Sequence, residues 1–195
     1  MEIILASQSP RRKEILDSFK LDFSTHTSNF DESKIKFKGS PSEFVVELAK
    51  EKGKVIYEKY PDSLIISADT TVHLNGKIYE KPKDFEEAFL FLKDLSGQTH
   101  QVYTGICICH QDRILTDYGV TKVTFHQVDD KQIRHYAQKI NSLDKAGGYA
   151  VQGAGALIIN KIEGCFFNVM GLPITPLANL LKKCGVDLWD TGKAL

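Results

Sequence analysis

Residues 64–72 read Leu-Ile-Ile-Ser-Ala-Asp-Thr-Thr-Val, and this stretch decides the fold that we expect. A short run of apolar and β-branched residues is typical of a strand covered on both faces, and the small Ser67 and Ala68 permit close approach of a neighbouring element. We expect the strand to stop at Asp69. Ligands of open α/β sheets bind beyond the carboxyl ends of the strands, so a carboxylate there is placed to hold a metal or activate water. The alternative is an Asp that only caps a turn or a helix.

The composition is that of a soluble globular protein. The chain has 42% hydrophobic and 26% charged residues, and its length fits one domain or two small lobes that share a cleft. We treat residues 1–195 as a single domain. The 25 basic and 25 acidic residues give a formal net charge of 0. A general binder of nucleic acid or of an anionic membrane surface would carry a basic excess, so we expect neither partner.

The N-terminus and the cysteines indicate a cytoplasmic protein. The first residues lack the basic segment and the long apolar run of a signal peptide, and no later run is long enough to span a bilayer. The four cysteines form no CxxC pair and no zinc-like spacing, which fits a reducing compartment. Cys107 and Cys109 are expected to share one face of a strand as small buried residues.

A phosphate site is indicated near the N-terminus. Residues 3–6 predict a short buried strand, which a polar loop joins to a helix that begins at Pro10 after the N-cap Ser9. Arg11 and Arg12 then fall in the first helical turn, where cations are unfavourable unless an anion is bound by the free backbone N–H groups. Strand, loop, helix N-terminus and arginines together can bind phosphate. A solvated basic turn is the alternative.

The second predicted helix brings a lysine to its apolar face. Residues 21–39 are polar and irregular and suggest a rim loop, and Ser40 and Pro41 then begin the helix. Its apolar stripe includes Lys52. A lysine there either extends its ammonium group to solvent, the commoner outcome, or meets a negative partner. In the second case Lys52 is a candidate phosphate ligand.

Further elements follow from turn and capping signals along the chain. The glycine-dense stretch 144–156 matches neither GxGxxG nor a P-loop, so its glycines indicate close backbone approach to a ligand or tight turning. A hydrogen-bonding role is favoured for His100 over a catalytic one. The expected elements are a hairpin at Asn75-Gly76, a helix after Asp84, strands over 101–109 and 113–128, a helix over 130–140, a buried strand at 157–159, a loop over 164–172 and a last helix from Thr175-Pro176.

Taken together, eight short motifs in this order resemble the Maf family over nearly the whole chain. They are residues 7–12 (SQSPRR), 31–32 (DE), Lys52, 68–70 (ADT), 81–82 (KP), 96–105 (SGQTHQVYTG), 144–149 with 152–153 (DKAGGY and QG), and 168–173 (NVMGLP).

The resemblance implies a fold and an activity. The implied fold is α/β, a mixed twisted sheet with flanking helices and two lobes around a central cleft, similar to inosine triphosphatases. The implied activity is hydrolysis of a nucleoside triphosphate to the monophosphate and pyrophosphate with a divalent metal, Mg²⁺ or Mn²⁺, often by a homodimer. Clearance of modified nucleotides and a link to cell-division arrest are also implied. The alternative is a nucleotide-binding regulator of septum formation without significant turnover.

The resemblance also implies roles for individual residues. Asp69 stands at the position of the proton acceptor, and Arg11, Thr70 and Gln152 stand where the dTTP/UTP-hydrolysing branch differs from the branch that acts on 7-methyl-GTP. Gln152 offers a donor and an acceptor, which suits the O4 and N3–H edge of uracil or thymine. The expected site is therefore catalytic Asp69, Lys52 and Lys81, substrate-binding Ser7, Arg11, Arg12, Thr70 and Gln152, and metal-binding Glu32 and Asp69.

Overall fold

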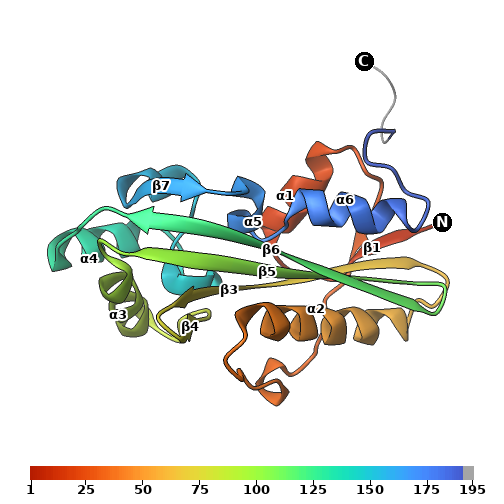
Figure 1. The fold of residues 1–195 in the computed structure, drawn as a ribbon, viewed down its shortest axis with the longest axis horizontal. Coiled ribbons are helices and arrows are strands. Elements are labelled where there is room, and N and C mark those ends of the chain that lie inside the picture. The colour runs from red at the N-terminus through yellow and green to blue at the C-terminus, as the bar shows by residue number, and fades with distance from the viewer. Residues whose placement is uncertain (191–195) are drawn as a thin grey trace. The chain divides into compact units, whose positions relative to one another are not determined.

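The computed structural model describes residues 1–190 and confirms a mixed α/β fold (Figure 1). Seven strands form one sheet in the order β2-β1-β3-β5-β6-β7, and β4 pairs with β3. The strands are β1 Ile3–Leu5, β2 Ser24–Thr25, β3 Leu64–Leu74, β4 Lys77–Tyr79, β5 Thr99–His110, β6 Arg113–Phe125 and β7 Ile159–Glu163. The α-helices are α1 Pro10–Ser18, α2 Pro41–Tyr57, α3 Phe85–Leu95, α4 Asp130–Lys139, α5 Phe166–Met170 and α6 Ile174–Lys182, and the 3₁₀ helices are η1 Glu32–Lys34, η2 Ser142–Asp144, η3 Ala146–Gly148 and η4 Gly153–Leu157.

The chain forms two compact units, and three long strands run through both. The first unit comprises residues 1–69, 104–119 and the chain from Gly171 onward, and the second comprises residues 70–103 and 120–170. None of the helices over residues 1–190 has both the length and the apolarity that a membrane crossing needs.

In the first unit the sheet is covered on both faces. Strand β1 runs parallel to β2 and β3. Helix α2 lies on one face of these strands, and α1 and α6 lie on the other (Figure 1). The apolar run of β3 from Leu64 to Ala68 is therefore completely buried, as its sequence predicts. Cys107 and Cys109 are buried beneath α2, and both are free thiols.

Helix α2 packs unusually close to the sheet because small residues line the contact. The Ser67 hydroxyl donates to the carbonyl of Ala49 at 2.6 Å, and a Cβ atom on Gly53 would lie 2.7 Å from that hydroxyl oxygen. A Cβ atom on Gly105 of β5 would lie 2.4 Å from the backbone of Val45. These contacts fix the height of α2 above β3 and β5.

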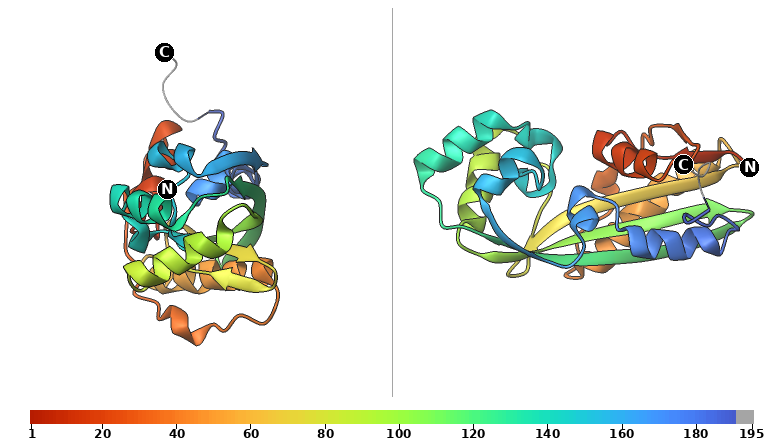
Figure 2. Two further views of the ribbon diagram at one scale, coloured as in Figure 1. Left: turned by 90° about the vertical axis from the view of Figure 1, so that its left-hand side faces the viewer. Right: turned by 90° about the horizontal axis from the view of Figure 1, so that it is seen from above.

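The second unit is built on a hairpin and a helix pair. Asn75 and Gly76 connect β3 to β4 with φ of 50° and 82°, which is the backbone of the expected Asn-Gly turn. Helices α3 and α4 pack side by side (Figure 2). The core between them and the strands is aromatic-rich and includes Phe125, Tyr136 and Tyr149.

Three expectations about local structure were wrong. Strand β3 does not stop at Asp69 but continues to Leu74, because pairing with β4 extends it. The apolar residues at 157–159 do not form a buried strand: Leu157 lies exposed in η4, and β7 starts only at Ile159.

The third correction concerns residues 164–172, which contain helix α5 and are not entirely a loop. The side chain of Asn168 in this helix is buried and donates to the Val102 carbonyl and the Thr121 hydroxyl, both at 3.0 Å. These long-range hydrogen bonds fix a short helix that no local periodicity announces.

Candidate active site

Lys52 joins two carboxylates in the first unit. Its ammonium nitrogen lies 2.5 Å from Oδ1 of Asp69 and 2.8 Å from Oε1 of Glu32. The Lys52 side chain is 13% exposed and Asp69 is 8% exposed. The lysine on the apolar face of α2 therefore meets negative partners and does not extend to solvent, although extension is the commoner outcome for such residues.

The close packing of α2 accounts for this contact. Gly53 lies against Ser67, and Lys52 and Asp69 are the near neighbours of these two residues along their own elements. Glu32 comes from η1, in the irregular segment before α2. Three separate elements thus contribute one side chain each to an ion-paired cluster.

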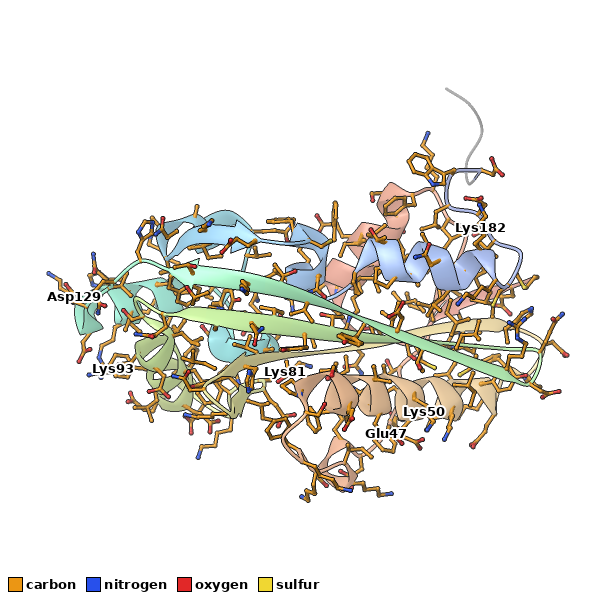
Figure 3. The ribbon with its side chains drawn as sticks, in the orientation of Figure 1. Glu47, Lys50, Lys81, Lys93, Asp129 and Lys182 are labelled. Carbon is orange, nitrogen blue, oxygen red and sulfur yellow. The ribbon has the colours of Figure 1, made fainter. Side chains whose placement is uncertain are left out.

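Other lysines of α2 show a contrasting arrangement. Lys50 pairs with Glu47 on the same helix at 3.2 Å, and Figure 3 labels both on the face of α2 away from the sheet. Pairs of this kind within one helix contribute about 0.2–0.5 kcal/mol to its stability. Lys52 differs because its partners lie on other elements and its ammonium group is largely shielded from water.

Ser7, in the loop after β1, hydrogen-bonds Arg12 of α1, which lies beside this cluster. Helix α1 begins at Pro10 with Ser9 as N-cap, as predicted, although the Ser9 side chain makes no capping bond. The Ser7 hydroxyl instead accepts from the Ser9 N–H at 3.1 Å and from Nη1 of Arg12 at 3.2 Å. Nε of Arg12 donates to the Gly171 carbonyl at 2.7 Å.

The parallel pairing of β1 and β3 explains why these loops meet. Leu5 is in register with Ile66, and the Ala6 N–H donates to the Ile66 carbonyl at 2.7 Å. The chain beyond β1 therefore leaves the sheet beside the part of β3 that leads to Asp69. This is the carboxyl-end position where open α/β sheets bind their ligands.

The pKa values of Asp69 and Arg12 reflect burial within a charged cluster. Burial raises the pKa of the Asp69 carboxyl above its usual value, Glu32 adds to the rise, and Lys52 and Arg12 oppose it. Burial lowers the pKa of Arg12, and Asp69 opposes that change. A carboxylate with a raised pKa is a stronger base, and the nearby cations favour its ionised form, which is the form that can accept a proton.

Glu32 and Asp69 are suited to a hard divalent cation. Both present carboxylate oxygens to one position, which the Lys52 ammonium group holds. Oxygen donors of this kind are those that Mg²⁺ and Mn²⁺ prefer, and phosphate oxygens and water complete such sites. Within residues 1–190, no group of three or more His, Cys, Asp or Glu side chains is arranged to hold a metal by itself.

The remaining predicted residues divide between the units. Arg11 is half-buried in the first turn of α1 and lowers the pKa of Arg12 through its charge. Thr70, Lys81 and Gln152 belong to the second unit. Lys81 is exposed in the segment after β4 (Figure 3), and Gln152 is exposed at the N-terminus of η4. The structure therefore links Ser7, Arg12, Glu32, Lys52 and Asp69 by direct contacts or shared electrostatics.

Some contacts of the cluster cannot be predicted from the type of residue that makes them. The Gly171 carbonyl orients Arg12, but a backbone acceptor can be placed only once the fold is known. The motif at residues 168–173 pointed to this segment without giving it a role. His100 is a structural hydrogen-bonding residue, as favoured from the sequence, because its Nε2 lies 2.8 Å from the Tyr149 hydroxyl.

Comparison with known proteins gives one consistent family. Residues 2–184 match the family model described as Maf-like protein. A protein of Clostridium perfringens (strain SM101 / Type A) named dTTP/UTP pyrophosphatase is 43% identical over 191 residues, which cover 96% of this chain and 100% of that protein. A protein of Pyrococcus furiosus with the same name is 49% identical over 181 residues, covering 93% and 94% of the two chains.

A distant likeness exists among solved structures. The crystal structure of a nucleoside-triphosphatase / dITP/XTP pyrophosphatase from Mycobacterium abscessus aligns with a TM-score of 0.45 and 10% identity, and covers 94% of this chain and 95% of that one. The family assignment does not depend on this likeness.

Proposed function

This chain belongs to the Maf family, and we propose that it is a nucleoside triphosphate pyrophosphatase that hydrolyses dTTP and UTP. The observation that carries the proposal is the contact of the largely buried Lys52 and Asp69, which Glu32 joins from the exposed side and which lies beside Arg12 at the start of α1. A carboxylate with a raised pKa among cations is the arrangement that water activation beside a polyphosphate requires. The names of the two relatives above support the same activity.

The reaction is attack of water on the α-phosphorus. A water oxygen forms a bond to that phosphorus while the bond to the bridging oxygen of the β-phosphate breaks. Asp69 accepts the water proton, and pyrophosphate leaves with the electron pair of the broken bond. Lys52 holds the Asp69 carboxylate in place before the proton transfer, since it donates to Oδ1 at 2.5 Å.

Cationic side chains bind the triphosphate. Arg12 is held by Ser7 and by the Gly171 carbonyl, so its guanidinium group is oriented before substrate binds. We assign Lys81 to the phosphates as well, and Arg11 and Thr70 to substrate binding. Their contribution is position and electrostatic stabilisation of the charge that develops on the phosphate oxygens.

Glu32 and Asp69 would hold the divalent cation, Mg²⁺ or Mn²⁺. When bound, the cation supplies neutralisation of negative charge on the phosphate oxygens. We also propose that residues 1–195 act as one domain, because a single family model runs through both compact units. A homodimer and a cytoplasmic location stay predictions.

Gln152 is the residue that we assign to base recognition. Its amide presents a donor and an acceptor, and uracil and thymine present an acceptor at O4 beside a donor at N3. A site built for these two hydrogen bonds discriminates against bases that leave its polar groups unpaired.

The test is product analysis with UTP, dTTP, CTP, GTP and ATP, each incubated separately with the protein and Mg²⁺ or Mn²⁺. We expect monophosphate and pyrophosphate from UTP and dTTP, and loss of turnover on addition of a chelator. Diphosphate and phosphate as products would place the attack at the γ-phosphorus and contradict the proposal. Nucleotide binding without turnover would indicate a regulator instead.

A further inference from the structure

Gln152 lies on a tight loop of the second unit. The loop folds back on itself between Ala150 and Gly155, because a Cβ atom on Gly155 would lie only 2.2 Å from the Ala150 carbonyl oxygen. The Gly155 N–H donates to the Gln152 carbonyl at 3.1 Å, and Gly153 has a positive φ of 57°. Gln152 is exposed at the turn of this loop. The close approach at Gly155 requires a glycine, and the positive φ of Gly153 favours one.

A buried tyrosine from helix α4 holds the base of the loop. The Tyr136 hydroxyl accepts a hydrogen bond from the Ala150 N–H at 3.1 Å and donates one to the Ala150 carbonyl oxygen at 3.4 Å. One phenol thus contacts both backbone polar groups of one residue. Tyr136 is 2% exposed, and its aromatic ring is packed in the core of the unit.

A second buried pair holds the residue before Ala150. The Tyr149 hydroxyl lies 2.8 Å from Nε2 of His100, and both rings pack edge-on against Phe125. Burial lowers the pKa of His100 to about 4 and raises the pKa of the Tyr149 phenol, so both groups stay neutral near pH 7. The hydrogen bond between them therefore persists over the physiological range.

The chemistry of uracil and cytosine makes this anchoring relevant. Uracil presents an acceptor at O4 and a donor at N3, whereas cytosine presents a donor at N4 and an acceptor at N3. An amide that turns over by 180° exchanges its donor and acceptor and so fits the other base equally well. Gln152 can discriminate between these bases only if its amide keeps one position and one orientation at the base. A fixed backbone beneath it does not set that orientation by itself, but a loop that moved would lose the position.

We propose that Tyr136 and His100 are positioning residues that fix the Ala150–Gly155 loop so that Gln152 distinguishes uracil from cytosine. Neither residue touches the substrate. This inference rests on the proposed function, because it assigns a determinant of specificity to the same reaction. The two buried rings act through the backbone of residues 149 and 150, and their removal changes selectivity more than turnover.

The test measures kcat/KM for UTP and for CTP in wild type and Tyr136→Phe. The variant removes only the hydroxyl, and we expect the preference for UTP to fall by up to about tenfold, as loss of hydrogen bonds of ordinary strength would cause. Tyr79→Phe is the matched control, because Tyr79 is equally buried in the same unit and its hydroxyl contacts Asp94 instead. The control should keep the UTP preference within about twofold.

A double variant separates positioning from general damage. In a Gln152→Ala background, Tyr136→Phe should change the UTP preference no further, because the side chain that it positions is absent. An equal effect in both backgrounds would overturn the proposal, and so would an unchanged preference in Tyr136→Phe alone. Thermal unfolding of each variant shows whether it is folded at the assay temperature.

Variants of His100 test the proposal if Tyr136→Phe does not fold. His100→Gln retains a group that can hydrogen-bond Tyr149 and should retain more of the UTP preference than His100→Phe, which cannot. Equal preferences in the two would count against the proposal. Wild type that turns over neither nucleotide would overturn the proposed function itself, whereas wild type that prefers UTP with unchanged variants would overturn this inference alone.

Discussion

At the scale of single residues, the contacts that a side chain makes say more about its role than its residue type does. Helix α2 carries several lysines, and the apolar stripe singled out Lys52 because it interrupts that stripe. The sequence could not name its partners, because Glu32 and Asp69 lie 20 and 17 positions away and meet it only in the folded chain. The same holds for the Gly171 carbonyl that orients Arg12.

Replacement of Asp69 by Asn removes the proton acceptor while it keeps the shape of the side chain. We expect kcat for UTP to fall by about 10²–10⁴-fold, the usual contribution of a general base, with a much smaller change in KM. Asp62→Asn, in the exposed turn before β3, is the control and should keep the wild-type kcat. Steady-state kinetics of the two variants decides the assignment, and near-normal turnover in Asp69→Asn would refute it.

His100 makes stability depend on pH. Its pKa is lowered from 6.5 to about 4 in the folded chain, solely through burial. Between these values the unfolded chain binds a proton that the folded chain does not, so stability is lost as the pH falls from 6.5 towards 4. The full effect is about 3 kcal/mol.

His100→Gln should lose this component of the pH dependence. The measurement is the free energy of unfolding from urea titrations of both proteins at several pH values between neutral and pH 4. We expect the difference between wild type and the variant to change with pH in the stated direction. Parallel curves would show that His100 is protonated in the folded protein, contrary to its burial.

At the scale of elements, helix and turn boundaries were well predicted where a local signal exists. Ser40 and Asp84 cap α2 and α3 by accepting from the backbone N–H of the third helical residue, and the Asn75-Gly76 turn is in place. Prediction failed where pairing or packing decides. Strand β3 continues past Asp69 because β4 pairs with it, and α5 exists because a buried Asn168 holds it.

The close packing of α2 on the sheet predicts that alanine substitution destabilises the fold to different degrees at two glycines. A methyl group on Gly105 would meet the Val45 backbone at 2.4 Å, whereas one on Gly53 would meet the Ser67 hydroxyl at 2.7 Å. The Val45 backbone moves only with the helix, whereas the Ser67 hydroxyl can rotate at the loss of its hydrogen bond to Ala49. We expect Gly105→Ala to cost about 1–3 kcal/mol or more of stability, and Gly53→Ala to cost less, as measured by urea unfolding. A larger cost at Gly53 would contradict the packing described here.

The segment from the last residue of η1 to Lys38 presents a row of positive charge. Lys34, Lys36 and Lys38 are exposed, and they alternate with half-buried apolar residues, one of which, Phe37, packs edge-on against Phe44. The row follows Glu32, which contacts Lys52. Exposed charges near a site accelerate encounter with an oppositely charged substrate and are screened by salt.

Neutralisation of this row should therefore lower kcat/KM at low salt and leave kcat unchanged. We expect the triple Lys→Gln variant to lose several-fold in kcat/KM for UTP at about 10 mM ionic strength and little at about 1 M. Three exposed lysines of the second unit, Lys122, Lys131 and Lys139, provide the matched control. Equal salt dependence in the two triple variants would exclude steering by the row.

At the scale of the whole molecule, the mixed α/β class follows from the buried run of β3 and from helices between strands. Two lobes are implied by the family resemblance, but the sequence does not place the boundary between the two compact units, because β3, β5 and β6 run through both without interruption. The residue pattern of each long strand continues unchanged across the boundary between the two units, because that boundary arises only from the packing of other elements. For the same reason Asp69 seemed to close a strand, although it closes only the first unit's share of β3.

The central claim is attack of water on the α-phosphorus, and isotope labelling tests it most directly. The protein is incubated with UTP and a divalent cation in water enriched in ¹⁸O, and the products are analysed by mass spectrometry. We expect one ¹⁸O atom in UMP and none in pyrophosphate. Label in pyrophosphate with unlabelled UMP would place the attack at the β-phosphorus and contradict the proposed reaction.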